Sequence, residues 1–330
     1  MLSQLGLFNS QKAASSVLPN LPGTFDRWPT VVMSLPPPTP NQAFCNVSAL
    51  EAGHVKAPLA WMLADVEDDE FITLPVLSYL VRHHSNGDSL LFDLGLRKDW
   101  QNLPPGLVRH ITDKLKFELD IPSDIVDSLA KGDTTPSDIK KVFVSHLHFD
   151  HYGDAALFPT PQFFVGEGSR ALAANTYPNN ANSPVPADVI PEDRTIYLDP
   201  KAWPALQIGP FPRALDFYGD GSVYVVDAGH GHIPGHLNLL VRTSADGGWI
   251  YLAGDSAHHW SLLTGEGKIG HHPHFGCAHA DPEAAAEHME RIKTLVRENP
   301  RVRVLLAHDE VWYNANKGGT AFWPGTIESL

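Results

Sequence analysis

The 330-residue sequence contains little cysteine and has no long hydrophobic run near its start. Its two cysteines, Cys45 and Cys277, are far apart and lack C-x-x-C spacing, which excludes a disulfide framework and a structural zinc ribbon. Residues 1–20 have one Lys and no continuous apolar core, so we expect neither a secretory signal nor a membrane-spanning helix there. The predicted location is therefore cytoplasmic.

Basic charge is also scarce. Lys and Arg number 24 against 38 Asp and Glu, which gives a formal charge of −14. Such a chain repels the phosphate backbone of a nucleic acid and an anionic membrane surface, so neither is an expected partner. Hydrophobic residues make up 43% of the sequence, which is enough for a full core and excludes a disordered chain.

Composition divides the chain into two parts. Residues 1–41 are rich in Pro, Ser and Asn and include a polyproline stretch from Pro36 to Pro40. We predict that they form a Pro-rich arm, which is either a loosely ordered tail or a segment that wraps the domain or a second subunit. Residues 42–330 are predicted to form a single domain. The oligomeric state stays open, with a homodimer as one alternative.

Helices and strands alternate along the predicted domain. Asp281 and Pro282 are typical of a helix N-terminus, and apolar residues on one face predict a helix that extends to about Asn299. Residues 107–119 have apolar residues at mixed helical spacing and are predicted to form a helical insert. Short apolar runs bounded by turn residues predict strands in both halves of the chain. Two β-rich halves, each closed by helices, predict an α/β fold built as a four-layered αββα sandwich.

Three imidazoles and two carboxylates fall within the nine residues 146–154, directly after the β-branched run 139–144. In an extended chain alternate side chains share a face, so His146, His148 and Asp150 can converge, while His151 points elsewhere. Imidazole and carboxylate groups in this pattern indicate a metal site. The geometry suits two ions better than one.

The motif His146-Leu147-His148-Phe149-Asp150-His151 resembles the signature of the metallo-β-lactamase superfamily, and the resemblance covers residues 74–309. The chain is most similar to the lactone- and lactam-hydrolysing branch typified by N-acyl-homoserine lactonases. That resemblance implies further ligands at the ends of later strands. By this resemblance one metal is held by His146, His148 and His236, the other by Asp150, His151 and His308, and Asp255 bridges them.

Five other residues are candidates for supporting or substrate-contacting roles. Asp93 ends an early strand that matches the family's strand-turn motif, and we expect it either to orient a ligand or a backbone amide, or to form only the turn. His258 stands three residues after the predicted bridging carboxylate, where lactonase relatives carry a Tyr near the substrate carbonyl. Tyr152, Trp260 and Phe275 flank the ligand positions and are candidates for an apolar substrate wall or for core packing.

The chain has 18 histidines, more than the predicted ligand set uses. Several others lie in loops next to the predicted ligands, where they could contact substrate, support a ligand or simply be exposed. These are His230, His232, His258, His259, His271, His272 and His274.

Together these features predict a dinuclear metal-dependent hydrolase that opens a small neutral cyclic ester or cyclic amide. The expected cofactors are two divalent ions, with zinc favoured over iron or manganese, and a hydroxide that bridges them would attack the ring carbonyl. Asp150 would carry the proton to the leaving group, and His258 would hydrogen-bond the carbonyl oxygen. The alternatives are an iron-containing oxidoreductase on the same fold, of the persulfide dioxygenase or flavodiiron kind, and a nuclease, which the acidic charge disfavours.

Overall fold

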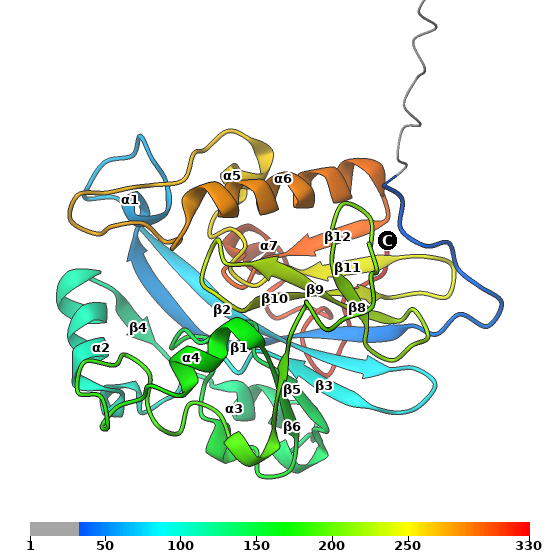
Figure 1. Cartoon of the computed structure of the whole chain (residues 1–330), viewed down its shortest axis with the longest axis horizontal. Coiled ribbons are helices and arrows are strands. Elements are labelled where there is room, and N and C mark those ends of the chain that lie inside the picture. Colours follow the sequence, from blue (N-terminus) through cyan, green and yellow to red (C-terminus); the bar gives the residue numbers. More distant parts are fainter. Residues whose placement is uncertain (1–32) are drawn as a thin grey trace, which may run out of the picture. The chain divides into compact units, whose positions relative to one another are not determined.

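Two β-sheets form the centre of the protein, whose computed structural model describes residues 33–330 (Figure 1). The strands of the larger sheet are β1 (Cys45–Pro58), β2 (Phe71–His83), β3 (Ser89–Phe92), β4 (Glu118–Asp120), β5 (Lys141–Phe143), β6 (Gln162–Gly166) and β7 (Thr195–Leu198). Those of the smaller sheet are β8 (Ala214–Asp216), β9 (Val223–Gly229), β10 (His236–Arg242), β11 (Trp249–Leu252) and β12 (Val302–Leu305). The strand orders are β4-β1-β2-β3-β5-β6-β7 and β12-β11-β10-β9-β8.

The inner faces of the two sheets share one apolar core. Tyr79 and Phe143 from the larger sheet belong to the same buried cluster as Val225, Leu239 and Ile250 from the smaller sheet. All five side chains are at most 1% exposed, as expected for strands with alternate residues on an inner face. The sheets therefore stack directly on one another.

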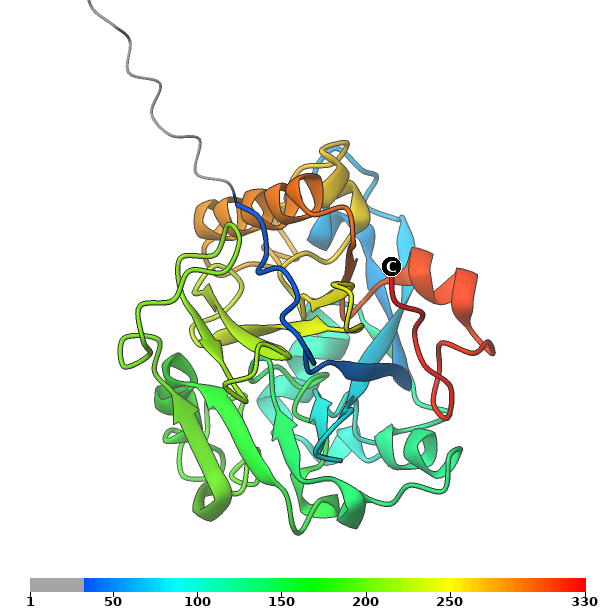
Figure 2. The same ribbon diagram turned by 90° about the vertical axis from the view of Figure 1, so that its right-hand side faces the viewer.

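Helices cover the outer faces. They are α1 (Leu59–Met62), α2 (Pro105–Arg109), α3 (Ile125–Ala130), α4 (Arg170–Ala173), α5 (Trp260–Thr264), α6 (Pro282–Glu298) and α7 (Glu310–Asn316). α6 packs against β9 and β12 of the smaller sheet, and α3 packs against β1 of the larger one, as Figure 1 and Figure 2 show from two directions. The predicted four-layered αββα sandwich is therefore confirmed.

The helix predicted over residues 281–299 is α6. Its N-cap is Asp281, whose side chain accepts a hydrogen bond from the Ala284 backbone amide, and Pro282 occupies the first turn. Its buried face includes Met289, Ile292 and Leu295. Local signals at its start and along its face were sufficient to predict this element.

The stretch 107–119 differs from its prediction. Only its first half is helical, because α2 continues as one π-helical turn over His110–Lys114 and then stops. The chain reverses at Lys116, which has a φ of 58°, and β4 then pairs antiparallel with β1. The end of this segment becomes a strand because the open edge of β1 provides backbone groups for it to pair with. The sequence of residues 107–119 alone does not reveal that edge.

The first described residues, 33–41, lie against the smaller sheet. The Leu35 amide donates to Asn299 Oδ1 at 2.8 Å, and Arg242 Nη2 donates to the Pro36 carbonyl at 3.0 Å. Residues 1–32 of the predicted arm lie outside the described residues, so the arm and its boundary at residue 41 stay predictions. Within residues 33–330, none of the helices combines the length and apolarity needed to cross a membrane.

Candidate metal centre

The site lies at one edge of the sandwich, where segments from both sheets meet beyond their strand ends. The motif residues 146–151 follow β5, His232 lies in the loop between β9 and β10, Asp255 follows β11, and His308 follows β12. The two sheets are joined here by a hydrogen bond from the Leu237 amide to the Ser145 carbonyl, at 2.9 Å. The Ala307 amide also donates to the Gly254 carbonyl at 3.0 Å, which joins the segments that carry His308 and Asp255.

Three imidazoles form the first ligand group. His232 Nε2 lies 3.0 Å from His146 Nε2 and 2.9 Å from His148 Nδ1, and these two atoms are themselves 2.9 Å apart. A ring nitrogen of a neutral imidazole either donates or accepts, so two of three nitrogens must play the same role and the three contacts cannot all be hydrogen bonds. Three lone pairs that converge on one point are instead what a metal ion requires.

The structure corrects the predicted set at this point, because His236 is absent from the group and His232 takes its place. His236 is the first residue of β10, paired with Gly229, and its Nε2 accepts the Asp255 backbone amide at 3.3 Å. Its ring lies beneath the turn that carries Asp255. A Cβ at Gly254, where φ is 49°, would come within 2.7 Å of His236 Nε2, so the ring leaves room only for glycine.

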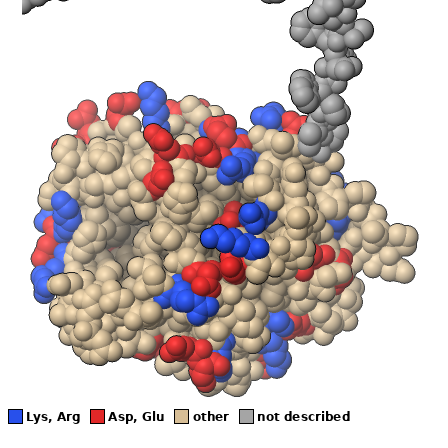
Figure 3. Space-filling view, viewed as in Figure 1, with Lys and Arg blue, Asp and Glu red and all other residues tan. Residues whose placement is uncertain are grey.

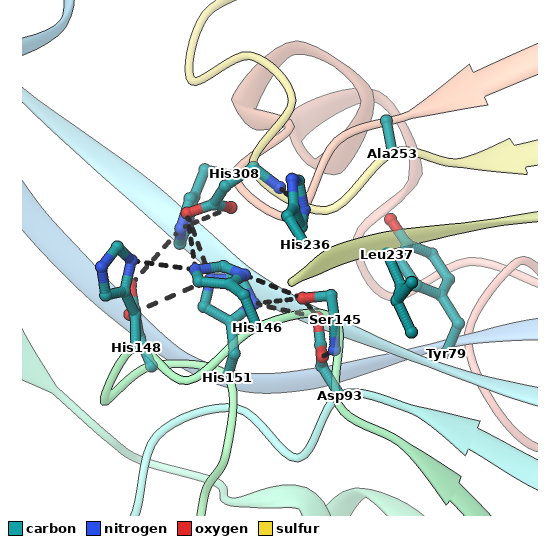
Figure 4. A network of polar contacts seen from close by, with 12 residues as sticks. Tyr79, Asp93, Ser145, His146, His148, His151, His236, Leu237, Ala253 and His308 are labelled. Atoms are coloured by element: carbon teal, nitrogen blue, oxygen red, sulfur yellow. Dashed lines mark hydrogen bonds and ion pairs between the residues drawn. The ribbon is translucent and has the colours of Figure 1, made fainter. Parts of the chain in front are cut away.

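The second group contains Asp150, His151 and His308, and Asp255 lies between the two groups. His308 Nε2 is 3.4 Å from Asp150 Oδ2 and 3.5 Å from Asp255 Oδ1. Asp255 Oδ2 is 3.2 Å from His151 Nε2 and 3.4 Å from His232 Nε2, so this carboxylate faces both groups at once. Figure 4 shows the motif imidazoles and His308 converging, with His236 set apart from them.

Hydrogen bonds outside the cluster orient these rings. Asp93 Oδ2 accepts from His151 Nδ1 at 2.9 Å, and the same carboxylate accepts the Ser145 amide and hydroxyl (Figure 4). His308 Nδ1 donates to the Pro75 carbonyl at 2.9 Å. Each contact leaves Nε2 free to face the cluster, the usual arrangement of an imidazole that binds a metal.

The histidines of the two ligand groups also differ in protonation. Burial and neighbouring imidazoles hold the pKa of His146 and of His232 well below the ordinary value, so both rings are neutral at pH 7 with their lone pairs available. Burial also acts to lower the pKa of His151 and His308, but Asp255 and the other nearby carboxylates raise it, to about 10 for His308. Protons therefore gather where two buried carboxylates require positive charge, and bound cations could replace them.

Two buried polar atoms of the site lack hydrogen-bond partners, as expected if metal ions bind there. His151 Nε2 and Asp255 Oδ1 are buried, have no hydrogen-bond partner and face the space between the two groups. Buried polar atoms are rarely left unpaired unless a ligand, ion or water satisfies them. Imidazole nitrogens and carboxylate oxygens suit zinc and similar divalent ions. The proposed ligand set is thus His146, His148 and His232 with Asp150, His151 and His308, joined by Asp255.

His258 lies beside the cluster, fully buried. Its Nε2 is 3.2 Å from Asp255 Oδ2, while its Nδ1 has no partner. The ring stacks over His308 with centroids 6.1 Å apart and meets Trp61 edge-on. One nitrogen thus supports the carboxylate and the other has no partner.

A cavity of about 350 Å³ opens onto the cluster. Among the described residues, its lining includes His148, Asp150, Asp255 and His308 of the site but no Lys, Arg or Glu. The remaining wall is largely apolar and includes Val55, Trp61, Leu74, Leu107, Ile111, Leu115, Phe117, Phe149 and Phe275. Figure 3 shows the face near α1 and α2 hollowed between uncharged surfaces, with charged side chains outside the hollow.

Of the three aromatic residues predicted to contact substrate, one lines the cavity and two do not. Phe275 lines it, whereas Tyr152 is 1% exposed within the core and Trp260 donates through Nε1 to Asp309 Oδ1 at 2.6 Å. The lining also includes His279, which the sequence did not single out. Its position two residues before a helix N-cap carries no metal-binding spacing, so only the tertiary structure brings it to the site.

Comparison with known proteins gives concordant matches. Residues 72–308 match the sequence model of the metallo-beta-lactamase superfamily. The metallo-hydrolase mfmC of Annulohypoxylon moriforme is 34% identical over 69% of this chain, and the gamma-lactamase MBL2 of Gibberella moniliformis is 38% identical over 52%. The chain spans 62% of the length of mfmC and 71% of that of MBL2. The crystal structure of a mutant of B. thuringiensis AiiA with N-decanoyl-L-homoserine bound at the active site aligns with a TM-score of 0.65 at 18% identity, covering 86% of this chain and 99% of that chain.

Proposed function

The chain belongs to the metallo-β-lactamase superfamily, as its sequence motif predicted, and we propose that it is a dinuclear metal-dependent hydrolase that opens a neutral cyclic ester or cyclic amide. One observation carries the proposal: two groups of converging ligand atoms share Asp255 and open onto an apolar cavity. The relatives named as a gamma-lactamase and a metallo-hydrolase support the same reaction class.

The chemistry divides between the cations and the side chains. Two bound divalent ions would supply hydroxide at neutral pH and polarise the ring carbonyl. Asp150 lines the cavity and lies beside His308, so its carboxylate can take up a proton and return it to the leaving oxygen or nitrogen as the ring opens. His151 is held through Nδ1 by Asp93, so its Nε2 keeps one orientation throughout.

The cavity supports a small uncharged substrate. Its wall is mostly aliphatic and aromatic, and among the described residues no Lys or Arg lines it that could pair with a carboxylate or phosphate. With a formal charge of −14, the chain also disfavours a nucleic-acid substrate. The absence of nucleic-acid and membrane partners, the cytoplasmic location and a homodimer stay predictions.

Metal removal tests the reaction class. We expect the purified, zinc-loaded protein to open at least one member of a panel of γ-lactones, γ-lactams and cyclic carbamates. A chelator should abolish turnover, and added zinc should restore it, because hydroxide is scarce at neutral pH without the ions. Purified protein that contains iron, shows optical bands of an iron centre and opens no ring would instead favour the oxidoreductase alternative.

Replacing His258 tests its proposed contact with the substrate carbonyl. If Nδ1 donates to the developing oxyanion, His258→Ala should lower kcat about 10- to 1000-fold, the range for losing one such donor, with metal content unchanged. His258→Tyr should recover part of this loss on simple lactones, since a phenol also donates. Elemental analysis accompanies each assay, with His271→Ala, an exposed histidine, as control. Unchanged kcat would remove His258 from the reaction, and metal loss would limit it to supporting Asp255.

A further inference from the structure

His279 is an unusual side chain in the cavity wall. It is 4% exposed, and neither Nδ1 nor Nε2 has a hydrogen-bond partner. A neutral imidazole carries one donor and one acceptor, and leaving both unpaired in a buried position is costly. Replacing such a ring by an apolar one would stabilise the free protein, so its presence indicates a ligand that pairs with it.

The backbone holds His279 in a fixed place beside the metal centre. The amides of Ala280 and Asp281 donate to the carbonyls of His232 and Gly231 at 3.0 and 2.9 Å. The segment that carries His279 is therefore joined to the loop that carries the ligand His232. Helix α6 starts directly afterwards, capped by Asp281, which prevents the segment from swinging away.

His279 is also a buried side chain of the cavity wall that lies beside the proposed metal ligands without belonging to them. Its ring centroid is 5.4 Å from that of His232 and 4.9 Å from that of His258. Outside the proposed ligand set, the described cavity lining has three other side chains with polar or thiol groups, Trp61, His110 and Cys277, and none of them is buried. Within the described lining, His279 is thus the buried hydrogen-bonding group outside the proposed ligand set that a substrate would meet. His258, the proposed partner of the carbonyl oxygen, is not among the lining residues.

The geometry of a small lactam matches this arrangement. In a five- or six-membered ring the amide is cis, so its N–H and C=O project from the same edge. If the carbonyl faces the metal centre, the N–H needs an acceptor directly beside that centre. We propose that His279 is a substrate-binding residue that accepts a hydrogen bond from the ring N–H of a cyclic amide or carbamate, and that it makes the site selective for rings with a free N–H. This inference rests on the proposed ring-opening function and narrows its substrate class.

The first part of the test measures selectivity in the metal-loaded, full-length protein. The probes are a benzo-fused γ-lactam and its N-methyl derivative, which cannot donate. Wild type should prefer the N–H lactam, and His279→Phe should lose about 10- to 100-fold in kcat/KM on it while changing little on the N-methyl lactam. Phenylalanine keeps a planar ring in place, so steric exclusion of the methyl group persists and the change in the ratio reports the hydrogen bond.

The second part uses readouts other than turnover. Metal content should stay at two ions per chain in His279→Phe, and its Tm should equal or exceed that of wild type, because an unpaired buried polar group has been removed. His279→Gln, whose amide oxygen can accept, should recover part of the N–H preference. Loss of an ion would show that His279 is a metal ligand together with His232 and His258. A lowered Tm would show that its role is structural, and an unchanged N–H preference would show that it has no role in substrate binding. Each of these three results overturns the proposal.

A wild-type protein that opens neither lactam is a failure of the proposed function, and binding then decides the fate of His279. Calorimetric titration of the metal-loaded protein with the same two lactams should still show tighter binding of the N–H form, and His279→Phe should lose that preference. Equal binding of both lactams to wild type would overturn the inference independently of hydrolysis. The control is His271→Ala, since His271 is exposed and lies in the same histidine-rich loop.

Discussion

His232→Ala is expected to remove one metal ion per chain and nearly all turnover. His232 Nε2 lies within 3.0 Å of the ligand atoms of both His146 and His148, so the substitution takes one of three imidazoles from that group. A metal that supplies hydroxide and polarises the carbonyl stabilises the transition state by several kcal/mol, which corresponds to a rate loss of about 1000-fold or more. Elemental analysis should fall from two ions to one, and kcat/KM on the best ring substrate should fall with it.

His236→Gln is the matched comparison for this prediction. The glutamine Oε1 can still accept the Asp255 amide, which His236 Nε2 accepts in the structure at 3.3 Å. We expect both ions to remain and turnover to fall by about 10- to 100-fold, the range for residues that orient a metal ligand. The opposite pattern, with two ions retained in His232→Ala and one lost in His236→Gln, would return His236 to the ligand set. His146→Ala and His308→Ala should behave like His232→Ala.

The sequence predicts most of the metal site, but it does not determine whether His232 or His236 is the ligand. The cluster from His146 to His151 could be predicted because its ligands lie within six residues directly after one strand. The strand period does not explain their arrangement, since β5 ends at Phe143 and the ligands lie in the bends and turns that follow it. His232 and His236 are four residues apart, and selecting between them requires knowing that β10 starts at His236 and that Gly235 turns with a φ of 87°. The sequence does not reveal either fact, although ligands beyond a strand end favour the residue in the loop.

The same distinction between local and long-range signals separates the elements that could be predicted from those that could not. α6 was predictable because its cap and its apolar face are encoded within the helix itself. β4 was not, because its pairing depends on the open edge of β1, more than sixty residues earlier in the chain. His279 likewise becomes visible only when the carbonyls of Gly231 and His232 hold its segment against the site. Long-range backbone pairing thus accounts for the features that local patterns missed.

Asp255→Asn is expected to cost the protein at least one ion, because Asp255 provides the charge shared by both groups. The carboxylate is 3% exposed, and its two oxygens lie 3.2 to 3.7 Å from nitrogens of His146, His151, His232, His258 and His308. Two divalent ions about 3.5–4 Å apart repel each other by roughly 18 kcal/mol at an effective dielectric constant of about 20. A buried negative charge between them is the direct way to offset that repulsion.

Asparagine keeps the size of the side chain but removes this charge and replaces one oxygen with an NH₂ group, which donates and cannot face a cation. We expect metal analysis to give one ion per chain or fewer and kcat/KM to fall by about 1000-fold or more, as for loss of a ligand. Asp309→Asn is the control, since Asp309 is a buried neighbour of His308 whose Oδ1 accepts from Trp260 Nε1 and the Trp312 amide instead of facing the cluster. That variant should retain two ions. If Asp255→Asn keeps both ions and normal turnover, Asp255 does not bridge them, and Asp150 would have to balance the charge of both cations alone.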